Sequence, residues 1–151
     1  KYDGWTAVAK GMAARMARLH WPADVVAERT AVVPVPLAQA RERERGYNQA
    51  AVLASELAEF WSIPCWTDVV TRDRYTQTQT RLTPSERSTN VHNAFRVNLL
   101  ARACLDGAHL ILVDDVLTTG ATLNSVANAL FESGARIVSY VTFGRARTAS
   151  D

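Results

Sequence analysis

One stretch of the sequence, residues 110–122, constrains the fold more than any other. Four apolar residues lead into two adjacent carboxylates, Asp114 and Asp115. A short loop rich in hydroxyl groups follows, with one glycine, and then an apolar pattern of helical period begins. A continuous run of β-prone residues is typical of a strand buried on both faces of a parallel sheet. The order predicts a strand over residues 110–113, an acidic tip, an anion-binding turn and a helix.

The chemistry of this stretch favours a phosphorylated sugar or a similar ligand. In open parallel sheets, ligands bind in the crevice beyond the carboxyl ends of the strands, where the acid pair would lie. Two carboxylates suit sugar hydroxyls or a magnesium ion. The loop suits a phosphate, because a helix N-terminus offers unpaired backbone N–H groups and Gly120 lets the backbone approach an anion. The Gly-Lys-Ser/Thr ending of a P-loop and the three spaced glycines of a dinucleotide site are both absent.

The same stretch resembles the phosphoribosyl diphosphate (PRPP) binding motif of type I phosphoribosyltransferases. In that family, acidic residues hold the ribose 2′ and 3′ hydroxyls, and the following loop wraps the 5′-phosphate. The resemblance implies that Asp114 and Asp115 form the catalytic pair and bind the ribose, with magnesium held by them directly or through PRPP. It implies a ribose and 5′-phosphate site that also includes the loop residues Leu117, Thr118, Thr119, Gly120, Ala121 and Thr122.

The composition limits the classes of protein to which the chain can belong, but it indicates no binding partner. With 151 residues, 48% of them hydrophobic, the chain is sized for one globular domain with a full core. A net charge of +2 is too small to indicate nucleic-acid binding by itself. No apolar run approaches the roughly twenty residues that span a bilayer, and no signal peptide is evident, so we expect a cytoplasmic protein. Cys65 and Cys104 lack the paired spacing of a disulfide framework or zinc site, and we expect both to be buried.

Helix-like and strand-like segments alternate along the chain. Apolar positions at three- and four-residue steps predict helices before residue 22, over residues 50–60 and after the motif. Short extended runs are predicted at residues 30–34, 66–71, 94–97 and 137–143. The alternation predicts an α/β fold with a mainly parallel central sheet flanked by helices. We assign residues 1–151 to one phosphoribosyltransferase domain, with an N-terminal helix and hood portion (1–30), a core (31–145) and a tail (146–151).

A longer ordered set of motifs narrows the resemblance to the ComF/GntX-like branch of the family, which is associated with competence and DNA uptake in bacteria. The set runs from about residue 32 to residue 145 and comprises Val33-Pro-Val-Pro-Leu37, Arg41, Arg45-Gly-Tyr-Asn-Gln49, Arg72-x-Arg74-x-Thr76, Gln79, Leu82, Arg87-x-x-Asn90 and Ala94-Phe95. Members of this branch often carry a cysteine-rich zinc ribbon before the domain, and these 151 residues contain no such ribbon.

Arginines in two segments admit two interpretations each. The alternating charges of residues 41–45 are typical of a solvated, self-compensating surface, and the polar segment 72–93 is typical of a functional lid or of an idle flexible loop. The resemblance implies instead a pyrophosphate site formed by Pro34, Val35, Pro36, Leu37, Arg41 and Arg45. It also implies a flexible basic loop, with its supports, that carries Arg72, Arg74, Thr76, Gln79 and Arg87.

The implied reaction is transfer of phosphoribose from PRPP, with magnesium as cofactor and release of pyrophosphate, to an unidentified nucleobase-like or other acceptor. The rival interpretation is a non-catalytic accessory protein that senses PRPP or handles nucleic acid, with a partner in the DNA-uptake machinery. Glu42 and Glu44 interrupt the arginines and would weaken a phosphate-backbone footprint, which argues against direct DNA binding. A homodimer is common in the wider family.

Overall fold

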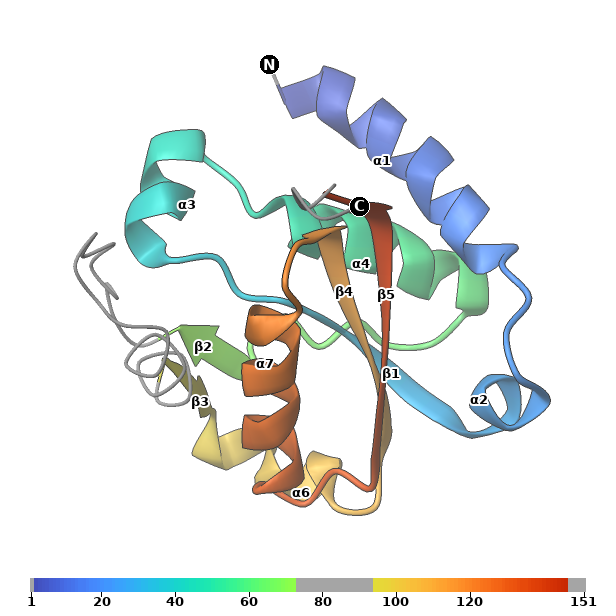
Figure 1. Ribbon diagram of the computed structural model, residues 1–151, viewed down its shortest axis with the longest axis vertical. Coiled ribbons are helices and arrows are strands. Elements are labelled where there is room, and N and C mark those ends of the chain that lie inside the picture. The colour runs from blue at the N-terminus through green and yellow to red at the C-terminus, as the bar shows by residue number, and fades with distance from the viewer. Residues whose placement is uncertain (1, 73–93, 147–151) are drawn as a thin grey trace.

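The computed structural model describes residues 2–72 and 94–146 (Figure 1). The strands are β1 (Arg29–Pro34), β2 (Val70–Arg72), β3 (Phe95–Val97), β4 (His109–Leu117) and β5 (Ile137–Arg145). The helices are α1 (Tyr2–Ala17), α2 (Ala23–Glu28), α3 (Gln39–Arg45), α4 (Gln49–Trp61), η1 (Leu99–Ala101), α6 (Arg102–Leu105) and α7 (Ala121–Phe131). Of these elements, α2, α3, η1 and α6 were not predicted from the sequence.

A parallel sheet in the order β1-β4-β5 forms the centre of the described part of the chain. The strands β2 and β3 form a separate antiparallel pair. On one face of the sheet, α1 and α4 pack around Val32 and Ile111, and on the other face α7, β2 and β3 pack around Val33 and Leu110. Successive residues alternate between two cores, which explains why residues 31–33 and 110–113 are apolar without interruption. The predicted α/β fold with a mainly parallel sheet flanked by helices is confirmed.

The connections after β1 and β4 leave the sheet on opposite faces. After β1 the chain passes through α3 to α4 on one face, whereas after β4 it enters α7 on the other (Figure 1). The chain also moves outward in opposite directions, because Cys65 pairs with Val32 on the outer side of β1 while β5 pairs with β4. The carboxyl ends of β1 and β4 therefore form a topological switch point, where open α/β sheets bind ligands.

Asn48 joins the loop after β1 to α4. Its side-chain oxygen accepts a hydrogen bond from Ala50 N at 3.0 Å and caps the helix, a position at which asparagine is favoured. Its amide nitrogen donates to Val35 O at 3.0 Å. Gly46, with φ at 82°, ends α3 in the left-handed conformation that favours glycine. The loop that leads into the switch point is thus held at both ends.

One predicted boundary is wrong at the centre of the motif. β4 continues to Leu117, so Asp114 and Asp115 lie inside a strand and not in the turn that follows it. The extension exists because β5 pairs with β4 as far as Leu117, whereas β1 pairs with it only as far as Val113. Local sequence periodicity contains no information about these partners.

The predicted strand over residues 66–71 is also too long. Residue Cys65 makes a single bridge to β1, Trp66 N donates to Val32 O at 2.8 Å, and β2 begins only at Val70. The chain turns between these points, because Val69 and Val70 are buried in the core on the α7 side of the sheet. The segment therefore joins the outer side of β1 to the β2–β3 pair.

The two cysteines differ in burial. Cys65 is half-buried, whereas Cys104 is exposed, contrary to expectation, because the short helix α6 buries only Leu105. Within residues 2–72 and 94–146, no helix combines the length and apolar character needed to cross a membrane. The division of the chain into hood, core and tail stays a prediction.

Candidate functional site

An acid pair lies at the switch point. Asp114 and Asp115 follow Val113, the last residue of β4 that pairs with β1, so they border the crevice left where β1 departs. Both are half-buried. The backbone N–H of Asp115 donates to Asp114 Oδ1 at 2.9 Å, which fixes one carboxylate against the strand. The pair is therefore placed by the strand itself and not by a loop.

The environment of Asp114 disfavours its charged form. Burial raises the pKa of this carboxyl to about 6; the hydrogen bond from the Asp115 N–H opposes the rise, and the charge of Asp115 adds to it. An ionised Asp114 is thus held at a free-energy cost. Hydroxyl donors or a cation beside the pair would relieve that cost, so the electrostatics favour a polyhydroxylated or metal-bound ligand.

The loop after β4 has the predicted connection to a helix. Gly120 has φ at 77° and immediately precedes α7, whose first turn contains Ala121 and Thr122. Thr119 Oγ1 accepts a hydrogen bond from Ala121 N at 3.4 Å, and Asn124 N donates to Gly120 O at 2.9 Å. The loop consequently presents a tight turn and a helix N-terminus, which is a suitable arrangement for an anion.

A pocket of about 210 Å³ adjoins this loop. Its lining residues are Leu117, Thr118, Thr119, Gly120, Leu123, Asn124, Tyr140 and Arg145. The loop residues were predicted from the motif, whereas Tyr140 and Arg145 were missed. They belong to β5, and only the pairing of Leu117 with Arg145 reveals that the end of this strand reaches the loop.

A second pocket, of about 220 Å³, lies beside the loop after β1. Its lining residues are Pro34, Pro36, Leu37, Glu42, Asn48, Ala51, Thr67, Asp68, Val70, Thr71 and Arg72. Three residues of the predicted pyrophosphate site thus lie with Arg72 around one cavity. Val35 is buried between them, and its N–H donates to Val113 O at 2.9 Å. That bond attaches the loop directly to the strand that carries the acid pair.

Among the predicted arginines, Arg41 and Arg72 share one electrostatic neighbourhood. The Arg72 guanidinium is half-buried, 5.4 Å from the centroid of the Phe95 ring. Burial lowers its pKa, and the positive charge of Arg41 lowers it further. A nearby anion would offset both effects.

Arg45 is directed elsewhere, because its Nη1 donates to Gln49 Oε1 at 2.7 Å. The remaining predicted loop residues, Arg74, Thr76, Gln79 and Arg87, lie outside the described residues.

The acid pair fits the expected magnesium ion. Magnesium is usually held by one or two carboxylates together with phosphate oxygens of a substrate, not by a cage of protein ligands. Asp114 and Asp115 provide two such carboxylates. No cluster of three or more histidine, cysteine or acidic side chains suitable for a metal is found over the described ranges. The donor set therefore favours an ion that arrives with a phosphorylated ligand.

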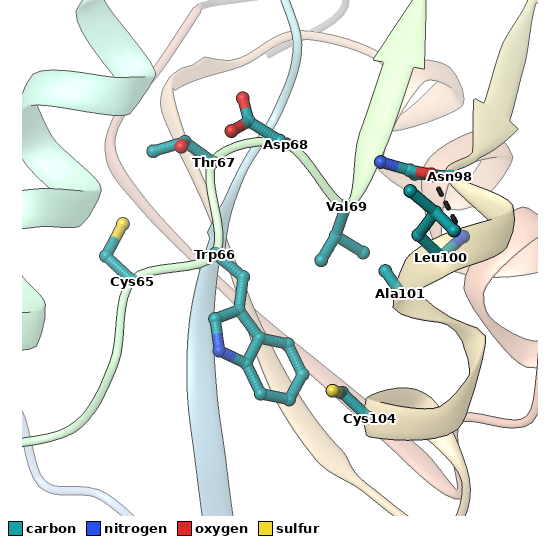
Figure 2. Close-up of a pocket in the computed structure, with 9 residues that line it drawn as sticks. All are labelled: Cys65, Trp66, Thr67, Asp68, Val69, Asn98, Leu100, Ala101 and Cys104. Carbon is teal, nitrogen blue, oxygen red and sulfur yellow. Dashed lines mark hydrogen bonds between the residues drawn. The ribbon is translucent and has the colours of Figure 1, made fainter.

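A third pocket lies away from the acid pair, on the outer side of β1 (Figure 2). It measures about 370 Å³ and is lined by Cys65, Trp66, Thr67, Asp68, Val69, Asn98, Leu100, Ala101 and Cys104. Figure 2 shows the Trp66 indole directed toward Cys104, with the Asn98 side chain accepting a hydrogen bond from Leu100 N at 3.0 Å. No sequence pattern links the two segments, and this pocket was not predicted.

Comparison with known proteins agrees with this geometry. The model of the phosphoribosyl transferase domain family matches residues 43–150. The chain belongs to that family. It is 37% identical over 126 residues to Competence protein F of Haemophilus influenzae, with 79% of this chain and 55% of the relative covered. It is 39% identical over 107 residues to the DNA utilization protein YhgH of Escherichia coli, covering 71% of this chain and 45% of the relative. The predicted family and its ComF/GntX-like branch are confirmed. The chain spans about half the length of these curated relatives.

Solved structures share the fold at low sequence identity. The glutamine PRPP amidotransferase of B. subtilis aligns with a TM-score of 0.58 at 19% identity, covering 91% of this chain and 26% of that one. The phosphoribosylpyrophosphate synthetase of Mycobacterium smegmatis aligns with a TM-score of 0.53 at 17% identity, covering 91% of this chain and 33% of that one. Likeness at this level establishes the type I phosphoribosyltransferase fold alone.

Proposed function

We propose that this phosphoribosyl transferase domain binds PRPP with magnesium at the β1–β4 switch point and transfers the phosphoribosyl group to an acceptor. The observation that carries the proposal is the position of Asp114 and Asp115. They lie in the second half of β4, the strand that leads directly into the Gly120 turn and α7. Membership of the phosphoribosyl transferase family supports it. We further propose that the activity serves competence or DNA uptake, which the names of the relatives support.

Each wall of the crevice has a role in this proposal. Asp114 and Asp115 accept hydrogen bonds from the ribose 2′ and 3′ hydroxyls, while backbone N–H groups and hydroxyls of residues 118–122 bind the 5′-phosphate. The loop after β1 faces the pyrophosphate, where Arg41 and Arg72 offset its charge. Charge-assisted hydrogen bonds are worth about 1.5–3 kcal/mol each, so several at one phosphate hold it firmly. Hydrogen-bond energies of this size support tight binding of PRPP more directly than they support catalysis.

The proposed reaction exchanges one bond at ribose C1 for another. The bond from C1 to a pyrophosphate oxygen breaks, and its electron pair leaves with the pyrophosphate. A bond forms between C1 and a nitrogen or similar atom of the acceptor, which gives up its proton to water. The transition state is cation-like, as in other glycosyl transfers, so the carboxylates beside the ribose stabilise its positive charge. Magnesium, when bound, supplies positive charge that offsets the charge on the departing pyrophosphate.

Calorimetric titration of PRPP, with and without magnesium, tests the proposal. We expect saturable, magnesium-dependent binding to the wild-type chain and no binding to the Asp114→Asn/Asp115→Asn variant. An Asp106→Asn variant, changed at an exposed carboxylate before β4, serves as the matched control and should bind normally. Release of pyrophosphate with one of a series of bases would then establish turnover. Failure of the folded wild-type chain to bind PRPP would refute the proposal.

A second candidate function is a non-catalytic accessory role, favoured by the names Competence protein F and DNA utilization protein among the relatives. In this role the same pocket senses PRPP, or the chain handles nucleic acid for the uptake machinery. PRPP binding without pyrophosphate release from any base would favour it. A steep salt dependence of DNA binding would also favour it, since phosphate contacts release counterions.

A further inference from the structure

The pocket beside the phosphate-binding loop has a wall that the sequence motif does not account for. Tyr140 and Arg145 of β5 line it together with the loop and the first turn of α7. The motif therefore describes only one side of this cavity, and the strand that follows α7 supplies the other.

Backbone pairing holds the end of β5 against the loop. Arg145 pairs with Leu117, the last residue of β4, and Ala146 N donates to Leu117 O at 2.8 Å. Tyr140 lies on the same face of β5 as Val138, which packs in the core beneath α7, because alternate residues of a strand share a face. Arg145, five residues further along, lies on the opposite face of β5 and reaches the pocket at the end of the strand, where it pairs with Leu117.

The lining of this pocket carries charge of one sign. Arg145 is the single charged residue among its described lining residues, and no carboxylate is among them. Hydroxyl or amide groups come from Thr118, Thr119, Asn124 and Tyr140. The positive end of the α7 dipole lies at the same place. A volume of about 210 Å³ exceeds the share of several water molecules, about 30 Å³ each in the liquid. These features match a phosphomonoester.

We propose that Arg145 binds the 5′-phosphate of the phosphoribosyl ligand, in the pocket that Tyr140 also lines. This inference rests on the proposed function and deepens it, because it assigns one part of the ligand to a strand outside the motif. A guanidinium forms charge-assisted, often bidentate hydrogen bonds with a phosphate. Arg145 is thus a specificity residue that favours a phosphorylated sugar over the free sugar.

Calorimetry with three ligands tests the assignment. We would titrate PRPP, ribose 5-phosphate and inorganic pyrophosphate into the wild-type chain and into Arg145→Ala, Arg145→Lys and Arg102→Ala. Arg145→Ala should weaken PRPP and ribose 5-phosphate by the same factor, about tenfold to a hundredfold, and leave pyrophosphate unchanged. The affinities of Arg145→Lys for PRPP and ribose 5-phosphate should lie between those of the wild type and Arg145→Ala. Lysine keeps the positive charge but lacks the planar guanidinium that can form two parallel hydrogen bonds with a phosphate. Arg102→Ala, at an exposed arginine of α6, should match the wild type.

The outcomes separate this inference from the function on which it rests. If Arg145→Ala binds all three ligands as the wild type does, or loses pyrophosphate alone, the role of Arg145 is wrong while PRPP binding stands. If the wild-type chain binds neither PRPP nor ribose 5-phosphate, both proposals fail. Thermal denaturation monitors the folding of each variant. Arg145→Gln, which keeps a polar side chain at this exposed position, replaces the alanine variant if the latter unfolds.

Discussion

Ionisation of Asp114 lowers the stability of the folded chain. Its pKa is raised to about 6 from 3.8, so the folded chain binds this proton more tightly than the unfolded chain. The associated stability is fully present below about pH 4 and is lost as the pH rises through about 6. At neutral pH the ionised carboxylate therefore destabilises the free protein, and a bound ligand is needed to offset the effect.

We expect Asp114→Asn to raise the free energy of unfolding at pH 7.5 by about 1–2 kcal/mol, a value reduced for the partial exposure of the group. Below about pH 4 the gain should vanish, because the wild-type carboxyl is then neutral. Urea denaturation over a pH series measures the difference. Asp106→Asn, at an exposed carboxylate, serves as the control variant. An equal gain for Asp114→Asn at all pH values would contradict the assigned cause.

At the scale of the element, the junction of β4 with α7 depends on one glycine conformation. Gly120 has φ at 77°, which costs a residue with a Cβ about 1–2 kcal/mol. An added Cβ would lie 3.7 Å from Leu117 Cδ1, which is ordinary contact, so the cost comes from the backbone and not from a clash. The same argument applies to Gly107, which has φ at 70° with open space around it and lies at the opposite end of β4.

These two glycines form a matched pair of variants. Gly120→Ala and Gly107→Ala should each lower the free energy of unfolding by about 1–2 kcal/mol. Under the proposed function, only Gly120→Ala should also weaken PRPP binding, because its backbone would lie beside the 5′-phosphate. Denaturation and calorimetry on both variants measure the two effects. Gly11→Ala, inside α1 with no atom within 4 Å of the added Cβ, should instead stabilise by about 0.5–1 kcal/mol. If Gly120→Ala and Gly107→Ala lost PRPP affinity equally, the proposed role of Gly120 in phosphate binding would be wrong.

Elements defined by local chemistry could be predicted from the sequence, and those defined by distant partners could not. Asn48 and Gly46 act where their side-chain and backbone preferences place them. The extension of β4 depends on pairing with β5, which lies beyond an intervening helix. Arg145 could not be predicted for the same reason, because only its pairing with Leu117 places it beside the loop.

At the scale of the whole molecule, the crevice joins segments that lie far apart in the chain. The loop after β1 and Arg72 line one pocket, and the end of β4, the start of α7 and β5 line another. A ligand that touches both pockets binds only the folded chain. Its binding free energy therefore adds to the stability of the whole domain.

We expect saturating PRPP with magnesium to raise the thermal midpoint of the chain. At a hundredfold excess over the dissociation constant the added stability is about 2.7 kcal/mol, which corresponds to a shift of roughly 5–10 °C for a domain of this size. Differential scanning calorimetry measures the shift. The Asp114→Asn/Asp115→Asn variant should show none. A similar shift in that variant would mean that PRPP binds elsewhere.

Placing the two acids inside a strand has a consequence for sugar selection. Successive residues of a strand direct their side chains to opposite faces, so Asp114 and Asp115 reach one ligand only if it lies across the end of β4. Each carboxylate then meets a different hydroxyl of the ring. A deoxygenated sugar would leave one buried acceptor without its donor, at a cost of about 1–3 kcal/mol. Under the proposed function, the pleat of one strand would thus discriminate ribose from deoxyribose.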